Sequence, residues 1–271
     1  MAELIDVRHL GRERVIGAYV IDGVVVDPGP ASSVSALDEL VPRALLLTHV
    51  HLDHAGATGV LVRRHPDLVV YVHEAGAPHL VDPSKLLESA GRLYGDQMEQ
   101  LWGEVAPVPE ENIRALSGGE TVEGFRVAYT PGHASHHVCY LHEASGDAYV
   151  GDVAGVRIPP SDYTIAPTPP PDIDVEAWRE SVDKVADWAP ERLCLTHFGY
   201  ADDPTLQLAR LLEALARQLE WASLGDAESF DSAAASARPD DVEPQLVQAV
   251  PPEHAYLGLE RYLRKRAEAP A

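Results

Sequence analysis

Cysteine is scarce in this chain of 271 residues, which contains only Cys139 and Cys194. Both lie inside apolar runs, "HVCYL" and "RLCLTH", and neither belongs to a paired spacing such as C-x-x-C. A disulfide framework and a cysteine-based zinc site both need such pairs. The sequence therefore argues against both and predicts two buried free thiols.

Positively charged residues are also few relative to negatively charged ones. The chain has 21 Lys and Arg residues against 43 Asp and Glu residues, which gives a formal net charge of −22. Such an excess repels nucleic acid phosphates over long range and leaves no basic stripe to contact them. A bound cation can reverse this field only locally. We therefore expect no nucleic acid partner.

Long apolar runs are absent as well. Every such run is far shorter than the roughly 20 residues that cross a bilayer. The first residues, "MAELIDVRHLGRER", lack the apolar core of a secretion signal. Apolar residues nevertheless make up 45% of the chain, which is enough to form a sizeable core. We expect a soluble, cytoplasmic protein without a membrane partner.

Short apolar runs bounded by Gly, Pro or Asp predict strands along most of the chain. Apolar spacings of three and four predict helices at 84–103, 175–189 and 204–221 and in the terminal "YLGLERYLRKR". The proline-rich residues 157–171 predict an irregular loop, and residues 222–245 a surface connection. We expect one domain over residues 1–271 with a helical C-terminal segment at about 204–271. The predicted strands are "VIGAYVI", "GVVVD", "RALLLTHV", "DLVVYVHE", "FRVAYT", "HVCYLHE", "DAYVGD" and "RLCLTH".

The stretch "LLLTHVHLDHAG" contains four metal-ligand types close together, where a buried strand ends. His49 and His51 in an extended segment point to the same side, while Asp53 and His54 lie beyond the bend. The spacing therefore allows the first pair to bind one metal ion and the second pair to bind another.

Three later strands end in the same way, with His133 in "VAYTPGH", Asp152 in "AYVGD" and His197 in "LCLTH". Layered α/β folds build their sites at such strand ends, so we expect these side chains to converge with the earlier four. Seven nitrogen and oxygen donors are too many for one tetrahedral ion with an open position. The set predicts two divalent cations, for which zinc, iron and manganese all suit these donors.

The remaining histidines considered stand alone in the sequence. A lone histidine is more often an ordinary polar residue than a metal ligand. We interpret five of them in this way: His9, His65, His79, His142 and His254.

The ligand motif resembles that of a known family. "THVHLDHAG" is similar to the H-x-H-x-D-H signature of the metallo-β-lactamase superfamily, and "TPGH", "GD" and the late "TH" follow in that family's order. The resemblance covers roughly residues 15–200 and implies an α/β fold, a four-layer αββα sandwich. It also implies one metal ion bound by His49, His51 and His133, a second bound by Asp53, His54 and His197, and Asp152 as a bridge between them.

The same resemblance singles out residues around the ligands. Asp27 in "VVVDPG" matches a turn that lies beneath the metal site in the family, so it is either a support for a ligand or a simple turn residue. "GHASHH" resembles the family's G-H-T-x-G-H, which makes His137 the counterpart of a histidine behind the ligands. His136 replaces a glycine of that pattern and is a candidate to face the pocket.

Two segments are candidates for the pocket walls, against the alternative of simple packing. One is the predicted helix at 84–103, which carries Tyr94, Met98 and Trp102. The other is the proline-rich loop, which carries Tyr163.

The ligand set and the resemblance predict a dinuclear metallohydrolase. A metal-bridging hydroxide would attack a carbonyl or phosphoryl centre, and Asp53 would orient it and pass a proton. Esters, lactones, thioesters and β-lactams all fit such a centre, so the small-molecule substrate stays open.

A di-iron oxygen-binding or redox protein on the same fold is the main alternative. Flavodiiron relatives resemble H-x-E-x-D-H, and His51 stands in place of that glutamate here. However, "TPGHASHH", "TPPPDID" and "GLERYLRKR" resemble stand-alone relatives that include oxygen-binding di-iron proteins. A binding module with a structural metal ranks third, because structural sites are closed and need no second ion. A homodimer through the terminal helix is also open.

Overall fold

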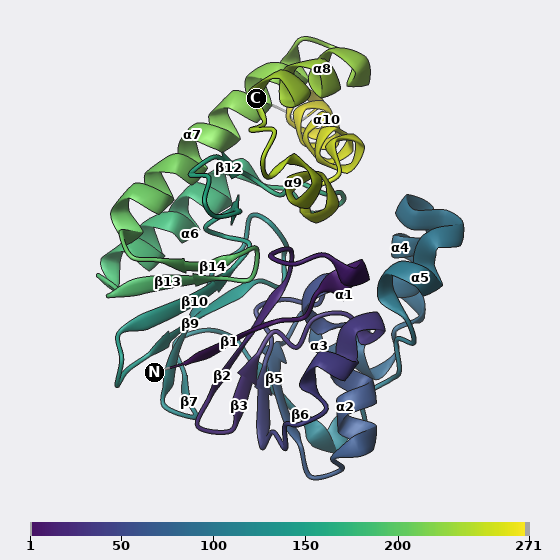
Figure 1. Cartoon of the computed structure of the whole chain (residues 1–271), viewed down its shortest axis with the longest axis vertical. Coiled ribbons are helices and arrows are strands. Elements are labelled where there is room, and N and C mark those ends of the chain that lie inside the picture. Colours follow the sequence, from purple (N-terminus) through teal and green to yellow (C-terminus); the bar gives the residue numbers. More distant parts are fainter. Residues whose placement is uncertain (1, 269–271) are drawn as a thin grey trace.

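Two stacked six-stranded sheets form the centre of the computed structural model, which describes residues 2–268 (Figure 1). In spatial order the first sheet contains β1 (Glu3–Asp6), β2 (Gly17–Ile21), β3 (Val24–Val26), β4 (Ala44–Leu46), β5 (Val69–His73) and β6 (Ile113–Leu116). The second contains β14 (Gly199–Ala201), β13 (Arg192–Leu195), β10 (Asp147–Gly151), β9 (Val138–His142), β8 (Phe125–Tyr129) and β7 (Thr121–Val122). The first sheet is parallel from β3 to β6, and in the second only β10 and β13 are parallel neighbours.

Alternate strand residues fill the space between the two sheets. In β3, Val24 and Val26 belong to this inner core, while Val25 belongs to the core on the outer side of the sheet. In β10, Tyr149 points inward and Val150 points outward. Such alternation follows from the two-residue period of a strand. The central strands β3 and β4 are apolar throughout because both faces of the sheet are covered there.

Helices cover the outer faces and complete a four-layer αββα sandwich, which confirms the predicted fold class (Figure 1). The helices between β4 and β6 in the chain are α1 (Leu52–Ala55), α2 (Thr58–Arg64), α3 (Ala77–Val81), α4 (Ser84–Tyr94) and α5 (Met98–Trp102). The later helices are α6 (Val175–Asp187), α7 (Pro204–Ser223), α8 (Ala227–Ala237), α9 (Glu243–Ala249) and α10 (Pro252–Glu268).

Aspartate caps start three of the later helices. The side chains of Asp174, Asp203 and Asp226 precede α6, α7 and α8, and each accepts a hydrogen bond from the backbone N–H three residues later. These bonds satisfy donors that have no partner within the helix. The cap at Asp226 helps to explain why residues 222–245, predicted as a surface connection, instead contain α8 and the start of α9.

The predicted helix at 84–103 is broken in two. α4 ends at Tyr94, Gly95 has a φ of +50°, and a short turn leads into α5. A positive φ suits glycine and cannot continue a right-handed helix. The loop at 157–171 is mostly irregular as predicted, but a hairpin of β11 (Val156–Arg157) and β12 (Thr164–Ile165) lies at its start.

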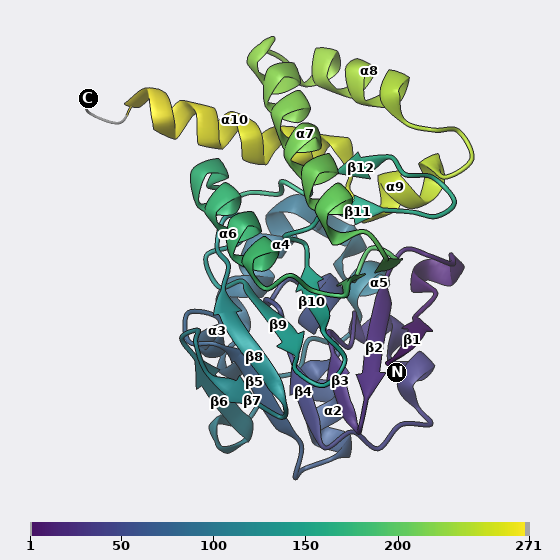
Figure 2. The same cartoon turned by 90° about the vertical axis from the view of Figure 1, so that its left-hand side faces the viewer.

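The C-terminal helices lie beyond the ends of the strands. α8 and α10 pack against α7, and Figure 2 shows α10 crossing above the sheets. The predicted helical segment at 204–271 thus contains four helices, although its last three residues lie outside the described part.

Within residues 2–268, no helix has the length and apolar character that a membrane span needs. Cys139 and Cys194 are buried free thiols, as predicted.

Candidate metal centre

The seven predicted donors converge at one end of the two sheets. The first sheet supplies four of them from a single segment, because His49 and His51 follow β4, and Asp53 and His54 lie in the adjoining α1. The second sheet supplies one donor after each of three strands: His133 after β8, Asp152 after β10 and His197 after β13.

Among the described residues the donors form three overlapping groups of three, in each of which the ligand atoms lie within 4.8 Å of one another; one group, His49, His54 and Asp152, shares residues with the other two, which are separate from each other. In one of the two separate groups, His133 Nε2 is 3.0 Å from His51 Nδ1. In the other, His197 Nε2 is 3.3 Å from Asp53 Oδ2. The two separate groups are His49, His51 and His133, and Asp53, His54 and His197.

The seventh donor, Asp152, lies between the two groups. Its Oδ2 is 3.2 Å from His133 Nε2 in the first group. Its Oδ1 is 3.3 Å from His54 Nε2 and 3.7 Å from His197 Nε2 in the second. A carboxylate in this position offers one oxygen to each group.

The histidine rings are held by their outer nitrogens. His133 Nδ1 is 2.8 Å from the carbonyl oxygen of Pro167, and His197 Nδ1 is 2.6 Å from that of Val15. Because a carbonyl only accepts, each Nδ1 donates, which leaves a lone pair on Nε2 facing the centre. Every residue has a backbone carbonyl, so the sequence does not indicate which carbonyl will accept a hydrogen bond from a histidine. Neither partner was therefore predicted.

Asp27 supports the centre from beneath, as the resemblance suggested. Its Oδ2 lies 2.8 Å from His54 Nδ1 and accepts hydrogen bonds from the hydroxyls of Thr48 and Thr196. Asp27 is fully buried and has a φ of +49°, a conformation that aspartate tolerates better than most residues. Sequence analysis missed both threonines, although each directly precedes a donor histidine in the repeated "LTH".

Gly151, the last residue of β10, permits close packing behind Asp152. It has a φ of +47°, and a Cβ at this position would lie 2.5 Å from Thr48 Oγ1 and 2.8 Å from His137 Nε2. Any side chain would therefore push against the residues that hold the donors.

His137 lies behind the centre, as expected from the resemblance. Its ring is fully buried with its centroid 5.0 Å from that of His49, and its Nδ1 is 2.9 Å from Thr130 Oγ1. It belongs to none of the groups of three donors.

Several donor atoms fit a bound cation because they are buried without a hydrogen-bond partner: His49 Nε2, His54 Nε2 and Asp152 Oδ1. Each such atom costs roughly 1–3 kcal/mol when nothing satisfies it. Nitrogen and carboxylate oxygen donors in this combination suit zinc, iron and manganese.

The protonation states of the donor residues also favour a bound cation. Burial, together with His133, lowers the pKa of His51 to about 4, so its ring offers a lone pair at neutral pH. Burial also opposes a charge on His54, but Asp152, Asp53 and Asp27 raise its pKa well above the usual value. The carboxylates therefore create a negative potential that attracts a proton or a cation.

Residues 13–197 match the family model of the metallo-beta-lactamase superfamily. The chain belongs to this superfamily. It is 28% identical over 214 residues to the metallo-beta-lactamase fold-containing protein ST1585 of Sulfurisphaera tokodaii, covering 74% of this chain and 78% of that protein. The crystal structure of ST1585 matches with a TM-score of 0.73 at 25% identity and covers 95% of this chain and 97% of that one.

Two further similarities bear on function and fold. Hydroxyacylglutathione hydrolase of Salmonella paratyphi A is 32% identical over 125 residues, a match that spans 44% of this chain and 38% of that enzyme. The protein TTHA1429 of Thermus thermophilus shares the fold, with a TM-score of 0.67 at 22% identity over 98% of this chain and 94% of its own. The structural similarity thus continues past residue 197 into the C-terminal helices.

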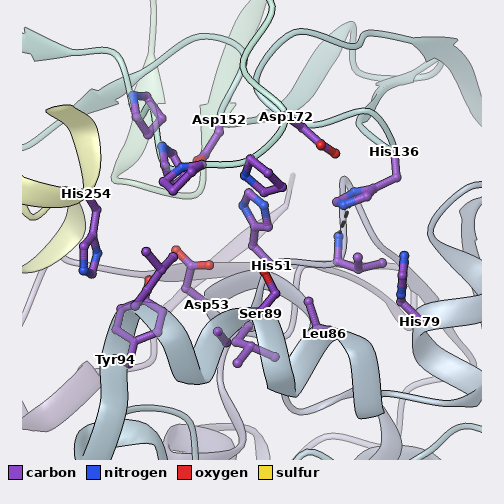
Figure 3. A pocket seen from close by; sticks show the side chains of 18 of the residues that line it. His51, Asp53, His79, Leu86, Ser89, Tyr94, His136, Asp152, Asp172 and His254 are labelled. Atoms are coloured by element: carbon purple, nitrogen blue, oxygen red, sulfur yellow. Dashed lines mark hydrogen bonds between the residues drawn. The ribbon is translucent and has the colours of Figure 1, made fainter. Parts of the chain in front are cut away.

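A cavity of about 290 Å³ opens beside the centre of this metallo-β-lactamase fold (Figure 3). His51, Asp53 and Asp152 form its inner end. Its walls come from α4 and α5, from the turn at 135–136, from residues 167–172 and from the junction of α9 and α10. A second cavity of about 370 Å³ reaches Asp53 and His197 and shares Tyr94, Trp102 and His254 with the first.

The structure places some of the candidate wall residues at the cavity and others away from it. Tyr94 and Trp102 line the cavity as proposed, whereas Met98 packs beside them without lining it. Tyr163 is not a lining residue, and its ring packs beneath the guanidinium of Arg217.

Three histidines that were interpreted as ordinary polar residues also lie at the cavities. His79 and His254 line the first cavity, and His254 also lines the second together with His9. The sequence around an isolated histidine does not indicate whether its helix or loop will lie beside a cavity.

His136, the residue that replaces a glycine of the family pattern, lines the first cavity (Figure 3). The backbone N–H of Val50 donates to His136 Nδ1 at 3.4 Å. Nδ1 therefore accepts, and the proton of the neutral ring resides on Nε2. Burial, with a contribution from His51, lowers the pKa of His136 to about 3, so the ring is neutral at physiological pH.

Proposed function

We propose that this protein is a metal-dependent hydrolase that cleaves an ester, lactone or thioester with the aid of two divalent cations. The observation that carries the proposal is the pairing of two three-donor groups with Asp152 between them. His49, His51 and His133 would hold one cation, Asp53, His54 and His197 the other, and Asp152 would contact both.

The similarity to hydroxyacylglutathione hydrolase supports a hydrolytic reaction at an acyl group. The match spans only part of that enzyme, so it supports the class of reaction and leaves the substrate to be argued from the cavity. Two bound divalent cations would supply Lewis acidity and lower the pKa of a bound water molecule to near neutrality.

Asp53 is the residue best placed to handle the proton of the attacking water. Its Oδ2 contacts His197, yet 22% of its side chain is exposed and it lines both cavities. A carboxylate at such a boundary can orient a water molecule and accept its proton.

His136 would hold the substrate. The hydrogen bond from Val50 fixes the protonated Nε2 of His136 as a donor, and the ring lines the cavity that Asp53 enters. Buried walls at Leu52 and Trp102 exclude water from one side of the same space. His136 would therefore position the carbonyl oxygen of the substrate, and Leu52 and Trp102 would keep bulk solvent away from it.

The test is to express the protein without metal supplementation, purify it anaerobically, and measure its metal content by elemental mass spectrometry. We expect about two divalent ions per chain and hydrolysis of model esters, lactones or thioesters that disappears on chelation and returns with metal. If two irons are bound, a visible absorption band appears on exposure to oxygen and none of these substrates is cleaved, the di-iron oxygen-binding function replaces the hydrolase.

A further inference from the structure

The two cavities at the centre are poor in positive charge. Among the described residues that line the first cavity, Lys85 is the sole lysine or arginine, and its side chain is exposed. The described lining of the second cavity contains neither lysine nor arginine, although it includes Glu253. Along the described walls, a substrate that approaches Asp53 from either side therefore meets no buried lysine or arginine that could bind a carboxylate or phosphate.

A carboxylate outside the donor set strengthens this bias. Asp172 lines the first cavity and accepts hydrogen bonds from the backbone N–H and the hydroxyl of Ser135, the latter at 2.6 Å. Hydrogen bonds to the ionised form keep a carboxylate charged. Figure 3 shows the carboxylate of Asp172 extending toward His136 in the same pocket. An anionic group there would be repelled.

The remaining walls of the first cavity are largely apolar. α4 contributes Leu86, Ala90 and Leu93, and α5 contributes Trp102. The opposite side is formed by the proline segment Pro169–Pro171 and by residues 249–251. Such walls bind a chain of methylene groups by removing it from water.

We propose that the substrate is an uncharged acyl compound whose apolar acyl chain lies between α4 and the proline segment. The proposal rests on the hydrolase function proposed above and narrows its substrate class. An acylglutathione carries carboxylates on its leaving group and an acyl-coenzyme A carries phosphates. Both are therefore disfavoured, whereas neutral esters, lactones and small neutral thioesters are favoured.

A matched pair of thioesters tests the charge preference on the metal-loaded protein. S-octanoyl-N-acetylcysteamine is neutral, and S-octanoylglutathione has the same acyl chain on an anionic leaving group. We expect kcat/KM to be about tenfold or more higher for the neutral compound, and to rise about fourfold per methylene from butanoyl to octanoyl. Equal or faster cleavage of the glutathione thioester, or no dependence on chain length, would overturn the proposal.

Unreactive thioethers separate this proposal from the hydrolase function. If no acyl compound is cleaved, the hydrolase function fails, and calorimetry with S-octyl-N-acetylcysteamine and S-octylglutathione still measures the preference of the cavity. Tighter binding of the neutral thioether supports the uncharged ligand class, and equal or tighter binding of the anionic one refutes it.

Two lysine substitutions on α4 provide a matched comparison. Leu86 lines the cavity, whereas the neighbouring Leu87 does not. Leu86→Lys should raise the kcat/KM ratio of anionic to neutral thioester by about fivefold to tenfold, the effect of one partly screened charge. Leu87→Lys should leave the ratio unchanged. If both variants change the ratio equally, the effect comes from overall charge and the cavity does not select its substrate in this way.

Discussion

Five of the seven donor side chains are buried and the other two, His51 and Asp53, are half-buried, whereas the cavity beside them is lined by side chains that are more often apolar and partly exposed. The donors stand at strand ends, and hydrogen bonds hold several of their outer atoms, as Asp27 does for His54. The cavity walls come from helices and loops that lie far apart in the sequence, from α4 at one side to the start of α10 at the other. A change in the cluster should therefore affect every substrate alike, and a change in the walls should discriminate among substrates.

The largest expected effect comes from removing the carboxylate between the two donor groups. Asp152→Ala should lower kcat/KM by more than about 1000-fold for neutral and anionic substrates alike, because neither cation would be correctly held. Elemental analysis should then find fewer than two ions per chain. Two retained ions with unchanged turnover would show that Asp152 does not join the groups.

Asp53→Asn separates proton transfer from metal binding. The amide keeps the shape of the side chain but cannot accept a proton, so kcat should fall by about 100- to 10,000-fold. The KM of a neutral ester should change little, because Asp53 is expected to act on the water and not on the acyl chain. Wild-type turnover with both metals bound would remove the proposed role of Asp53.

Asp27→Asn tests the support beneath the cluster. The amide weakens the hold on His54, so metal affinity should fall by about 10- to 100-fold, measured by competition with a chelator. Activity at saturating metal should largely return. Asp172→Asn is the control, since Asp172 bonds to Ser135 and contacts no donor. Equal losses in both variants would mean that overall charge, and not support of His54, sets the affinity.

Gly151→Ala tests how tightly the cluster is packed. A positive φ and a Cβ only 2.5 Å from Thr48 Oγ1 should lower the free energy of unfolding by about 1–3 kcal/mol, measured by chemical denaturation. Gly91→Ala is the control, because Gly91 lies in α4 with open space around its Cβ position. That variant should stabilise the chain by about 0.5–1 kcal/mol. Equal destabilisation by both would indicate that crowding behind Asp152 is not the cause.

The two regions also differ in what the sequence could predict. The donors could be recognised because each is a ligand-type residue at the end of an apolar strand, and the spacing around His51 resembles a known motif. The walls could be predicted only in part: Tyr94 and Trp102 were candidates, but the turn at Gly95 that separates α4 from α5 was not expected. His254 reaches the same space from α10, far along the chain, and nothing local in the sequence indicates this contact.

His136→Ala has the smallest expected effect and tests the boundary between the two regions. The residue lines the cavity while its ring stacks on His49 with centroids 6.2 Å apart. Loss of one neutral hydrogen-bond donor should raise KM by about 2- to 10-fold with little change in kcat or metal content. His142→Ala is the control, since His142 contacts Ser145 in a turn outside the cavity lining. A fall in kcat at constant KM would instead place His136 in the reaction itself, whereas a loss of metal would assign it to the donor cluster.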